Sequence, residues 1–320
     1  MNEPFTLKNN SELLAAVPAA LGFTPEASII VLLLHDVDGH TELRNSLRFN
    51  ISTEAAAGLT TTAAPAFRGI THAILIAVCG DWIADHAAQA LDIVRDSLRA
   101  LDITIMVRLH TRSFEQPGQW TDIDTGERGP ILPFKDSPVT ADQVFRGRRI
   151  AANRDEIIAE FTPATNPVPI VTGDPVEIIV PTCETIAAII AGATKAELHP
   201  DLATRTGIVI THNVNTRDAL LLLCADHPGP AAALWTRLAN QLTGAARLEA
   251  LTIAAICYYL ASDTIRTGIA LDIAADEANA AHLDYPRLAV LVNATLQAGV
   301  PPTKVHDLLA TIVDRARPQH

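Results

Sequence analysis

The hydrophobic pattern of this chain changes once along its length, and this change limits the folds that it can adopt. Up to residue 109 short apolar runs alternate with helical segments, whereas beyond residue 180 the apolar period is helical throughout. Alanine follows the same division, since residues 101–150 contain one alanine and residues 201–320 contain 24. We therefore expect an α/β part followed by an all-α part.

The N-terminal part is typical of a mixed sheet with helices. The expected elements are strands at 28–35 and 43–51, a helix at 53–67, a strand at 71–79, an amphipathic helix at 81–101 and a strand at 102–109. Asp38-Gly39 suits a tight hairpin turn between the first two strands, and Asp81 is placed to cap the second helix. The order β-β-α-β-α-β predicts one mixed sheet, because each strand-helix-strand crossover returns the chain to the same sheet.

A polar segment and a proline-rich segment separate the two parts. Residues 110–138 hold turn formers and few periodic apolar positions, which favours an irregular functional loop, and short helices are expected at 141–150 and 154–161. Three prolines within residues 162–169 then interrupt the pattern. We expect an α/β domain at 1–161, a linker or seam at 162–175 and an α-helical domain at 176–320.

The C-terminal part reads as successive helices joined by short turns, which form helical hairpins or a small bundle. The expected stops are Gly192, Gly207, residues 227–230, Gly244, residues 285–286 and residues 299–302. Small residues and a proline at Ser262, Ala274, Ala281 and Pro286 have the spacing of a tetratricopeptide unit. An ordinary bundle and a tetratricopeptide-like pair both remain open.

Charge and cysteine usage restrict the setting of the protein. A net charge of −12 and a pI of about 5.3 oppose general nucleic-acid binding. Cys79, Cys183, Cys224 and Cys257 lie far apart without a C-x-x-C pair, which favours buried reduced thiols in a cytoplasmic protein. The N-terminus shows no secretory pattern, and the apolar run 29–34 is far shorter than the ~20 residues of a membrane span. We expect no membrane association.

Two motifs and the C-terminal tail resemble domain-of-unknown-function family 4192, which is found mainly in actinobacteria. The first motif is LGFTPEAS at residues 21–28 after a helix with Pro18, the second is VFRGRRIAANRDE at 144–156, and the tail ends in a proline turn at 284–289. The resemblance implies no activity. Its members carry cysteines in a tryptophan-rich loop, whereas residues 121–138 contain none here. A metal role for such cysteines therefore does not carry over.

The first motif has a mainly structural interpretation. Gly22 suits the C-terminal end of a helix that begins at Asn10 or Ser11, with Phe23 as its hydrophobic contact and Pro25 as a bend into the strand. Glu26 and Ser28 at the strand entrance are candidates for ligand or partner binding. Capping of nearby backbone N–H groups would explain the same two residues.

The densest set of potential metal ligands is His35, Asp36, Asp38 and His40. Side chains that alternate along a hairpin point to opposite faces, so a solvated hairpin tip is the favoured interpretation. No cofactor is indicated.

Asp81, Asp85 and His86 are the candidates for acid/base catalysis, because they follow a buried strand where open α/β sheets place their sites. Helix capping and exposed charge explain them equally, and the chain has no G-x-S-x-G or convincing S-x-x-K nucleophile pattern.

Arg146, Arg148, Arg149 and Arg154 form the one notable basic concentration, with Arg128 and Lys135 upstream. Guanidinium groups match phosphates and carboxylates, so these residues, with Trp120 of the preceding loop, are candidates for binding a ligand or partner. An internal ion-pair surface with Asp155, Glu156 and Glu160 is the favoured alternative.

Helical hairpins without catalytic signatures favour a non-enzymatic cytoplasmic protein that interacts with a protein partner or with itself, as a scaffold or regulator. The alternative is an enzyme or a binding protein for a small phosphorylated ligand, with its site at the sheet ends and the 110–138 loop. RNA binding through the 146–154 cluster is a second alternative.

Overall fold

The computed structural model describes residues 7–37, 39–114, 117–145, 149–165, 174–192 and 201–316. It divides into an α/β unit of residues 1–156 with 297–299, and a helical unit of residues 157–296 with 300–320. The first contains a mixed six-stranded sheet with helices, and the described part of the second is all-helical. The expected fold class is thereby confirmed.

The sheet of the α/β unit has the strand order β2-β1-β3-β4-β5-β6. The strands are β1 (Ser28–Val37), β2 (His40–Asn50), β3 (His72–Val78), β4 (Thr104–Thr111), β5 (Gln119–Asp122) and β6 (Arg128–Pro130). Strand β1 pairs antiparallel with β2 and β3, β3 pairs parallel with β4, and the last two pairs are antiparallel. The predicted hairpin and the predicted crossover from β3 to β4 are both confirmed.

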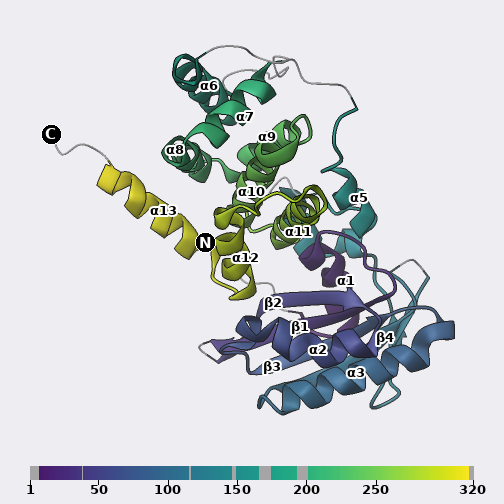
Figure 1. The fold of residues 1–320 in the computed structure, drawn as a ribbon. Helices are drawn as coiled ribbons and strands as arrows, with labels where there is room; N and C mark the ends of the chain where they lie inside the picture. Colours follow the sequence, from purple (N-terminus) through teal and green to yellow (C-terminus); the bar gives the residue numbers. More distant parts are fainter. Residues whose placement is uncertain are drawn as a thin grey trace. The chain divides into compact units, whose positions relative to one another are not determined.

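The principal core of this unit lies between one sheet face and two helices, α2 (Thr53–Thr62) and α3 (Ala84–Arg99), as Figure 1 shows. Alternate residues of β1 and β3 face this core, among them Val31 and Leu75, which are fully buried. The apolar stripe of α3 includes Leu91 and Leu98, also fully buried. The continuous apolar run of β1 is explained by its place between β2 and β3, where side chains on both faces of the strand are buried.

Local signals set the ends of the first helices with one exception. Helix α1 (Asn10–Leu21) is capped by Asn9 and ends at Gly22, whose φ of 72° fits the expected left-handed stop. The expectation that Asp81 caps α3 is wrong, since the capping position is Ile83 and no side chain bonds there. Asp81 instead begins a short 3₁₀ turn, Asp81–Ile83, and its carboxylate pairs with Arg112.

The segment expected as an irregular loop carries the short hairpin β5–β6, which extends the sheet. Trp120 lies opposite Gly129, and a Cβ at Gly129 would come within 2.5 Å of the indole ring. The Trp120 Nε1 donates to Ser11 Oγ at 2.9 Å, and Ser11 Oγ donates to the Pro130 carbonyl at 2.7 Å. The indole therefore fits because position 129 lacks a side chain, and it attaches the hairpin to α1.

Two short helices complete the α/β unit and lead out of it. Helix α4 (Pro138–Phe145) follows a 3₁₀ turn at Phe134–Asp136, and helix α5 (Arg154–Ala159) crosses the unit boundary. The Asn153 carboxamide accepts from Glu156 N at 2.9 Å, which caps the start of α5.

The helical unit contains eight further helices within its described residues. They are α6 (Pro175–Ile190), α7 (Leu202–His212), α8 (Val214–Ala225), α9 (Pro228–Ala239), α10 (Gly244–Leu260), α11 (Thr264–Ala281), α12 (Arg287–Gln297) and α13 (Pro302–Ala316). No helix of the described chain is long and apolar enough to cross a membrane.

One expected stop in this unit is wrong. Gly207 lies inside α7, where a Cβ would come within 2.8 Å of Leu242 Cδ2, so the glycine permits close packing and does not end the helix. The chain breaks instead at Asn213, whose side chain accepts from Asn215 N at 2.7 Å and starts α8. The four positions of the tetratricopeptide-like spacing fall on α11 and the turns at its two ends.

Helix α10 is the centre of the helical unit and packs against both α9 and α11. Its residues from Ala250 to Cys257 are all nearly or fully buried, because neighbours surround the helix. The apolar face at 250–260 is thus occupied within the chain itself.

A buried polar network attaches the residues after α5 to the helical unit. The Arg247 side chain, 3% exposed, pairs with Glu277 and donates to the Phe161 carbonyl at 2.7 Å. Arg266 pairs bidentately with Glu160 at 2.7 and 2.6 Å. Because both arginines are buried, their bonds to these groups restrict how the residues after α5 pack.

Candidate functional site

An open hollow in the α/β unit brings together four segments that are separate in the sequence. Its volume is about 870 Å³, within the usual range for small-ligand sites. The lining residues are Thr24, Pro25, Glu26, Ser113, Phe114, Pro133, Phe134, Lys135, Arg149, Ile150, Ala151, Ala152, Asn153 and Glu156. They come from the strand entrance after α1, the segment after β4, the 3₁₀ turn after β6 and the residues at the start of α5.

Backbone hydrogen bonds hold two of these segments side by side. Phe23 and Ala151 form an isolated parallel bridge, in which Thr24 N donates to Ala151 O at 3.1 Å and Ala151 N donates to Gly22 O at 2.9 Å. The left-handed backbone of Gly22 turns the chain out of α1 into this bridge. Phe23 is 2% exposed and anchors the bridge in the core.

Charged side chains of both signs line the hollow. Arg149 is 73% exposed and forms an ion pair with Glu156, whose carboxylate also accepts from Ala152 N at 2.6 Å. Lys135 and Glu26 are exposed, and no ion pair within the described ranges engages either side chain. Arg149 and Lys135 are therefore the cationic groups that an anion entering the hollow could meet.

Comparison with known proteins bears on these segments. Residues 11–303 match the family described as Domain of unknown function (DUF4192). The chain belongs to this family. No curated protein and no solved structure matches the chain. The DUF4192 match covers both of the sequence motifs that meet in the hollow, residues 21–28 and 144–156.

Ser28, in the motif at residues 21–28, has an internal role. The side chain is fully buried, its Oγ donates to the Glu26 carbonyl at 2.5 Å, and it accepts from Arg48 Nε at 2.7 Å. Burial, with the nearby Arg154 as a smaller cause, lowers the pKa of the Arg48 guanidinium, while Asp155 opposes this effect. Ser28 therefore positions Arg48 and the Glu26 backbone, and only Glu26 of the pair lines the hollow.

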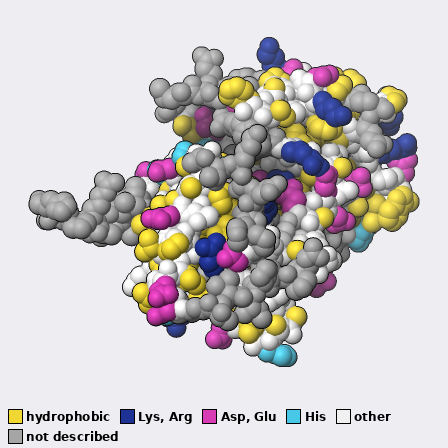
Figure 2. Space-filling model, turned by 90° about the horizontal axis from the view of Figure 1, so that it is seen from above, with side chains coloured by type: hydrophobic (Ala, Val, Ile, Leu, Met, Phe, Trp, Pro, Cys, Tyr) yellow, Lys and Arg dark blue, Asp and Glu magenta, His cyan; other side chains and the backbone are white. Residues whose placement is uncertain are grey.

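The remaining described binding candidates, Arg154 and Trp120, are not among the residues that line the hollow. Arg154 is half-buried beside Arg48, and Trp120 is 5% exposed in the contact with α1. Arg146 and Arg148 lie outside the described residues. On the face that Figure 2 presents, the described basic and acidic side chains are intermixed.

The three catalytic candidates lie apart from the hollow's lining. Asp81 accepts from Arg112 Nε at 2.8 Å, and Asp85 and His86 are exposed at the start of α3. Beside them Cys79 is buried, with its carbonyl 3.0 Å from His110 Nε2. Burial, assisted by Asp81, raises the pKa of the Cys79 thiol, so the thiol stays protonated at neutral pH.

The histidine-rich hairpin divides its side chains between two groups. His35 lies 4.0 Å from Glu42, while Asp36 accepts from Thr41 at 2.9 Å and lies 3.5 Å from His72. His40 is exposed at the start of β2, and Asp38 is outside the described residues. Among the described residues no group of three His, Cys, Asp or Glu side chains is arranged to hold a metal ion.

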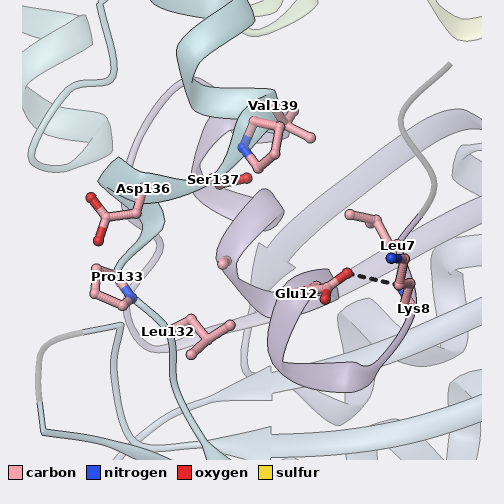
Figure 3. A pocket seen from close by; sticks show the side chains of 10 residues that line it. Leu7, Lys8, Glu12, Leu132, Pro133, Asp136, Ser137 and Val139 are labelled. Atoms are coloured by element: carbon pink, nitrogen blue, oxygen red, sulfur yellow. Dashed lines mark hydrogen bonds between the residues drawn. The ribbon is translucent and has the colours of Figure 1, made fainter. Parts of the chain in front are cut away.

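A second hollow of about 460 Å³ lies between α1 and the segment before α4, and Figure 3 shows its lining. Leu7, Leu132 and Val139 make much of it apolar. The Glu12 carboxylate accepts from Lys8 N at 2.9 Å, so this group is already engaged.

Two of the binding candidates from the sequence, Glu26 and Arg149, line the hollow, together with Lys135, which the sequence indicated only as a basic residue upstream of the arginine cluster. The sequence missed the apolar part of the larger hollow. Phe114 is 3% exposed, and Phe134 is half-buried in the 3₁₀ turn after Pro133. Phe114 and Phe134, aromatic residues close to prolines in an otherwise polar segment, were the available signal. Their convergence depends on the fold of the whole unit.

Proposed function

We propose that the chain is a non-catalytic binding protein whose α/β unit takes up an anionic group in the larger hollow. The observation that carries this proposal is the convergence of residues 24–26, 113–114, 133–135, 149–153 and 156, all within the DUF4192 match, on one concave surface. The carboxyl end of β4 lies at this place, where open α/β sheets usually bind ligands.

The lining suits a ligand that combines an anionic group with an apolar or ring-shaped part. Arg149 and Lys135 supply the positive charge, and Phe114, Phe134 and Ile150 supply apolar surface. A phosphate or carboxylate must compete with Glu156 for the Arg149 guanidinium. We therefore expect affinity to depend on Lys135 as well as on Arg149.

The positions of the three catalytic candidates support binding over catalysis. Asp81 is engaged by Arg112, Asp85 and His86 are exposed, and none of the three is part of the hollow's lining. General acid/base catalysis requires the group to lie within hydrogen-bond reach of the bound substrate.

Thermal unfolding with added ligands tests the proposal. Nucleotides, phosphorylated sugars, inorganic phosphate and dicarboxylates are screened, and a ligand of the hollow raises Tm with increasing concentration. Lys135→Ala and Arg149→Ala should each weaken this shift at least several-fold. Arg68→Ala, which removes an exposed positive charge elsewhere in the α/β unit, is the matched control and should retain it.

A panel in which no compound shifts Tm would contradict the proposal. An equal loss in Arg68→Ala would show that general charge, and not the hollow, causes any shift.

Protein–protein interaction through the helical unit is the second candidate function. Exposed aliphatic side chains on α12 and α13 favour it: Val290 is 53%, Leu291 64% and Leu308 64% exposed. A second copy of this chain is the first partner to test. Such a scaffold or regulator would act in the cytoplasm, because the four cysteines are free thiols.

A further inference from the structure

The second hollow of the α/β unit, which Figure 3 shows, has an apolar body. Leu7 and Leu132 line it with exposed side chains, Val139 is half-buried, and Ala15 of α1 is buried. Its volume of about 460 Å³ is in the range of small-ligand sites, which are mostly apolar and carry a few polar groups that orient the ligand. An aliphatic body therefore suits a ligand of this hollow.

Ser137 supplies an unused hydrogen-bonding group in the lining. The residue precedes α4 and is only 6% exposed. Its backbone N–H donates to the Phe134 carbonyl at 3.1 Å, and its carbonyl accepts from Ala141 N at 3.0 Å. No hydrogen bond to another described residue engages its hydroxyl, and a buried hydroxyl without a partner costs free energy. Because Ser137 lines the hollow, a ligand there can supply this partner.

The charged side chains of the lining oppose an anionic ligand. Glu12 and Asp136 carry two negative charges against the one positive charge of Lys8. The two Glu12 carboxylate oxygens accept from Lys8 N at 2.9 Å and from the Asn9 side chain at 3.2 Å. Each carboxylate oxygen has a further lone pair, so it can accept a second hydrogen bond. The lining thus offers acceptors of hydrogen bonds as well as the Ser137 hydroxyl.

A primary amide combines the groups that this lining requires. Its carbonyl oxygen can accept from the Ser137 hydroxyl, and its two N–H groups can donate to carboxylates. It carries no charge, so it avoids both the repulsion of an anion and the cost of burying a charge. A carboxylate lacks the donors, and an ammonium group lacks the acceptor. The first N–H groups of α4, in the turn that contains Val139, also favour an acceptor.

We propose that the second hollow binds a small aliphatic amide, with its carbonyl oxygen at Ser137 and its aliphatic chain against Leu7 and Leu132. This site is separate from the larger hollow in which the anionic group binds, although Pro133 lines both. Its test therefore includes a variant of each hollow.

Three probes with the same aliphatic chain test the head group: hexanamide, hexanoate and hexylamine. Their affinities for the full-length chain are measured at neutral pH by titration with saturation-transfer NMR. We expect hexanamide to bind most tightly, because hexanoate meets the two carboxylates and the hexylammonium ion cannot accept from Ser137. Tighter or equal binding of either charged probe, or no measurable binding of hexanamide, would overturn the proposal.

Variants then test the place of binding, with circular dichroism as the check on folding. Ser137→Ala should weaken hexanamide binding about two- to tenfold, since it removes one neutral hydrogen bond. Ser97→Ala changes a serine of α3 outside the lining, and it is the matched control that should keep the wild-type affinity. Arg149→Ala, a change in the larger hollow, should keep it as well. Wild-type affinity in Ser137→Ala, or a comparable loss in either control, would contradict the assignment to the second hollow.

Discussion

At the scale of single residues, the buried Arg108 of the α/β unit joins two acidic side chains from different elements. The Arg108 side chain is 7% exposed and donates to Asp92 on α3 and to Asp124 in the turn after β5 at 2.5 Å each. The hydrogen bond from Arg108 is the main reason that the pKa of Asp124 lies below its ordinary value. The sequence shows these residues only as separate charges.

This contact predicts a specific acid sensitivity. A carboxylate whose pKa is lowered by folding stabilises the native state at pH values above its ordinary pKa of 3.8. This stabilisation is lost as the pH falls through the lower pKa of the folded state. The urea midpoint of the wild-type chain should therefore fall below about pH 4. Asp124→Asn should be less stable at neutral pH, and its midpoint should fall less on acidification.

Asp85→Asn is the matched control for the acid series, because Asp85 is exposed and lies outside this ion-pair cluster. Its midpoint should follow the wild-type profile. An unchanged profile in Asp124→Asn would contradict the role assigned to the Arg108 contact.

At the scale of elements, capping explains where the sequence predicted boundaries well and where it did not. Gly22 ends α1 through its own backbone preference, so the signal is local. The break between α7 and α8 depends on Asn213, an ordinary capping residue that the neighbouring Gly207 obscured as a more obvious stop. Gly207 is explained by its close packing against Leu242 and Ala246, which lie far along the chain.

The cap at Asn213 yields a direct stability prediction. Asn213→Ala removes the bond to Asn215 N and should destabilise the folded chain by about 0.5–2 kcal/mol in urea unfolding. Thr243→Ala at the start of α10 is the matched control, since Thr243 occupies a capping position without a side-chain bond. Comparable losses in both variants would contradict the capping account.

The hairpin β5–β6 was not predicted from the sequence pattern. Its strands are too short for a clear period of two, and its turn lies among polar residues. What fixes it is the indole of Trp120 over Gly129 and the bond to Ser11 on α1. These contacts join distant segments, so the local sequence carries little of the signal.

At the scale of the whole molecule, the exposed aliphatic residues of the helical unit bear on association. If a second copy binds there, light scattering after size exclusion should give a mass above 34.2 kDa that rises with concentration. Leu291→Ser with Leu308→Ser should lower that mass, because polar side chains reduce the apolar area that association would bury.

Ala57→Ser, an exposed change in the α/β unit, is the matched control and should keep the wild-type behaviour. A mass of 34.2 kDa at every concentration would rule out self-association and leave a different protein as the partner.

The sequence by itself determined the order of elements, the change from α/β to all-α and the family, because these depend on periodicity, turn residues and contiguous motifs. It also identified Glu26 and Arg149 as binding candidates and Lys135 as a basic residue upstream of the arginine cluster. Only the tertiary structure decided that they share one hollow and that Trp120 and Ser28 serve internal packing. The physical reason is that contacts between distant segments depend on how helices and strands pack, which no local pattern encodes.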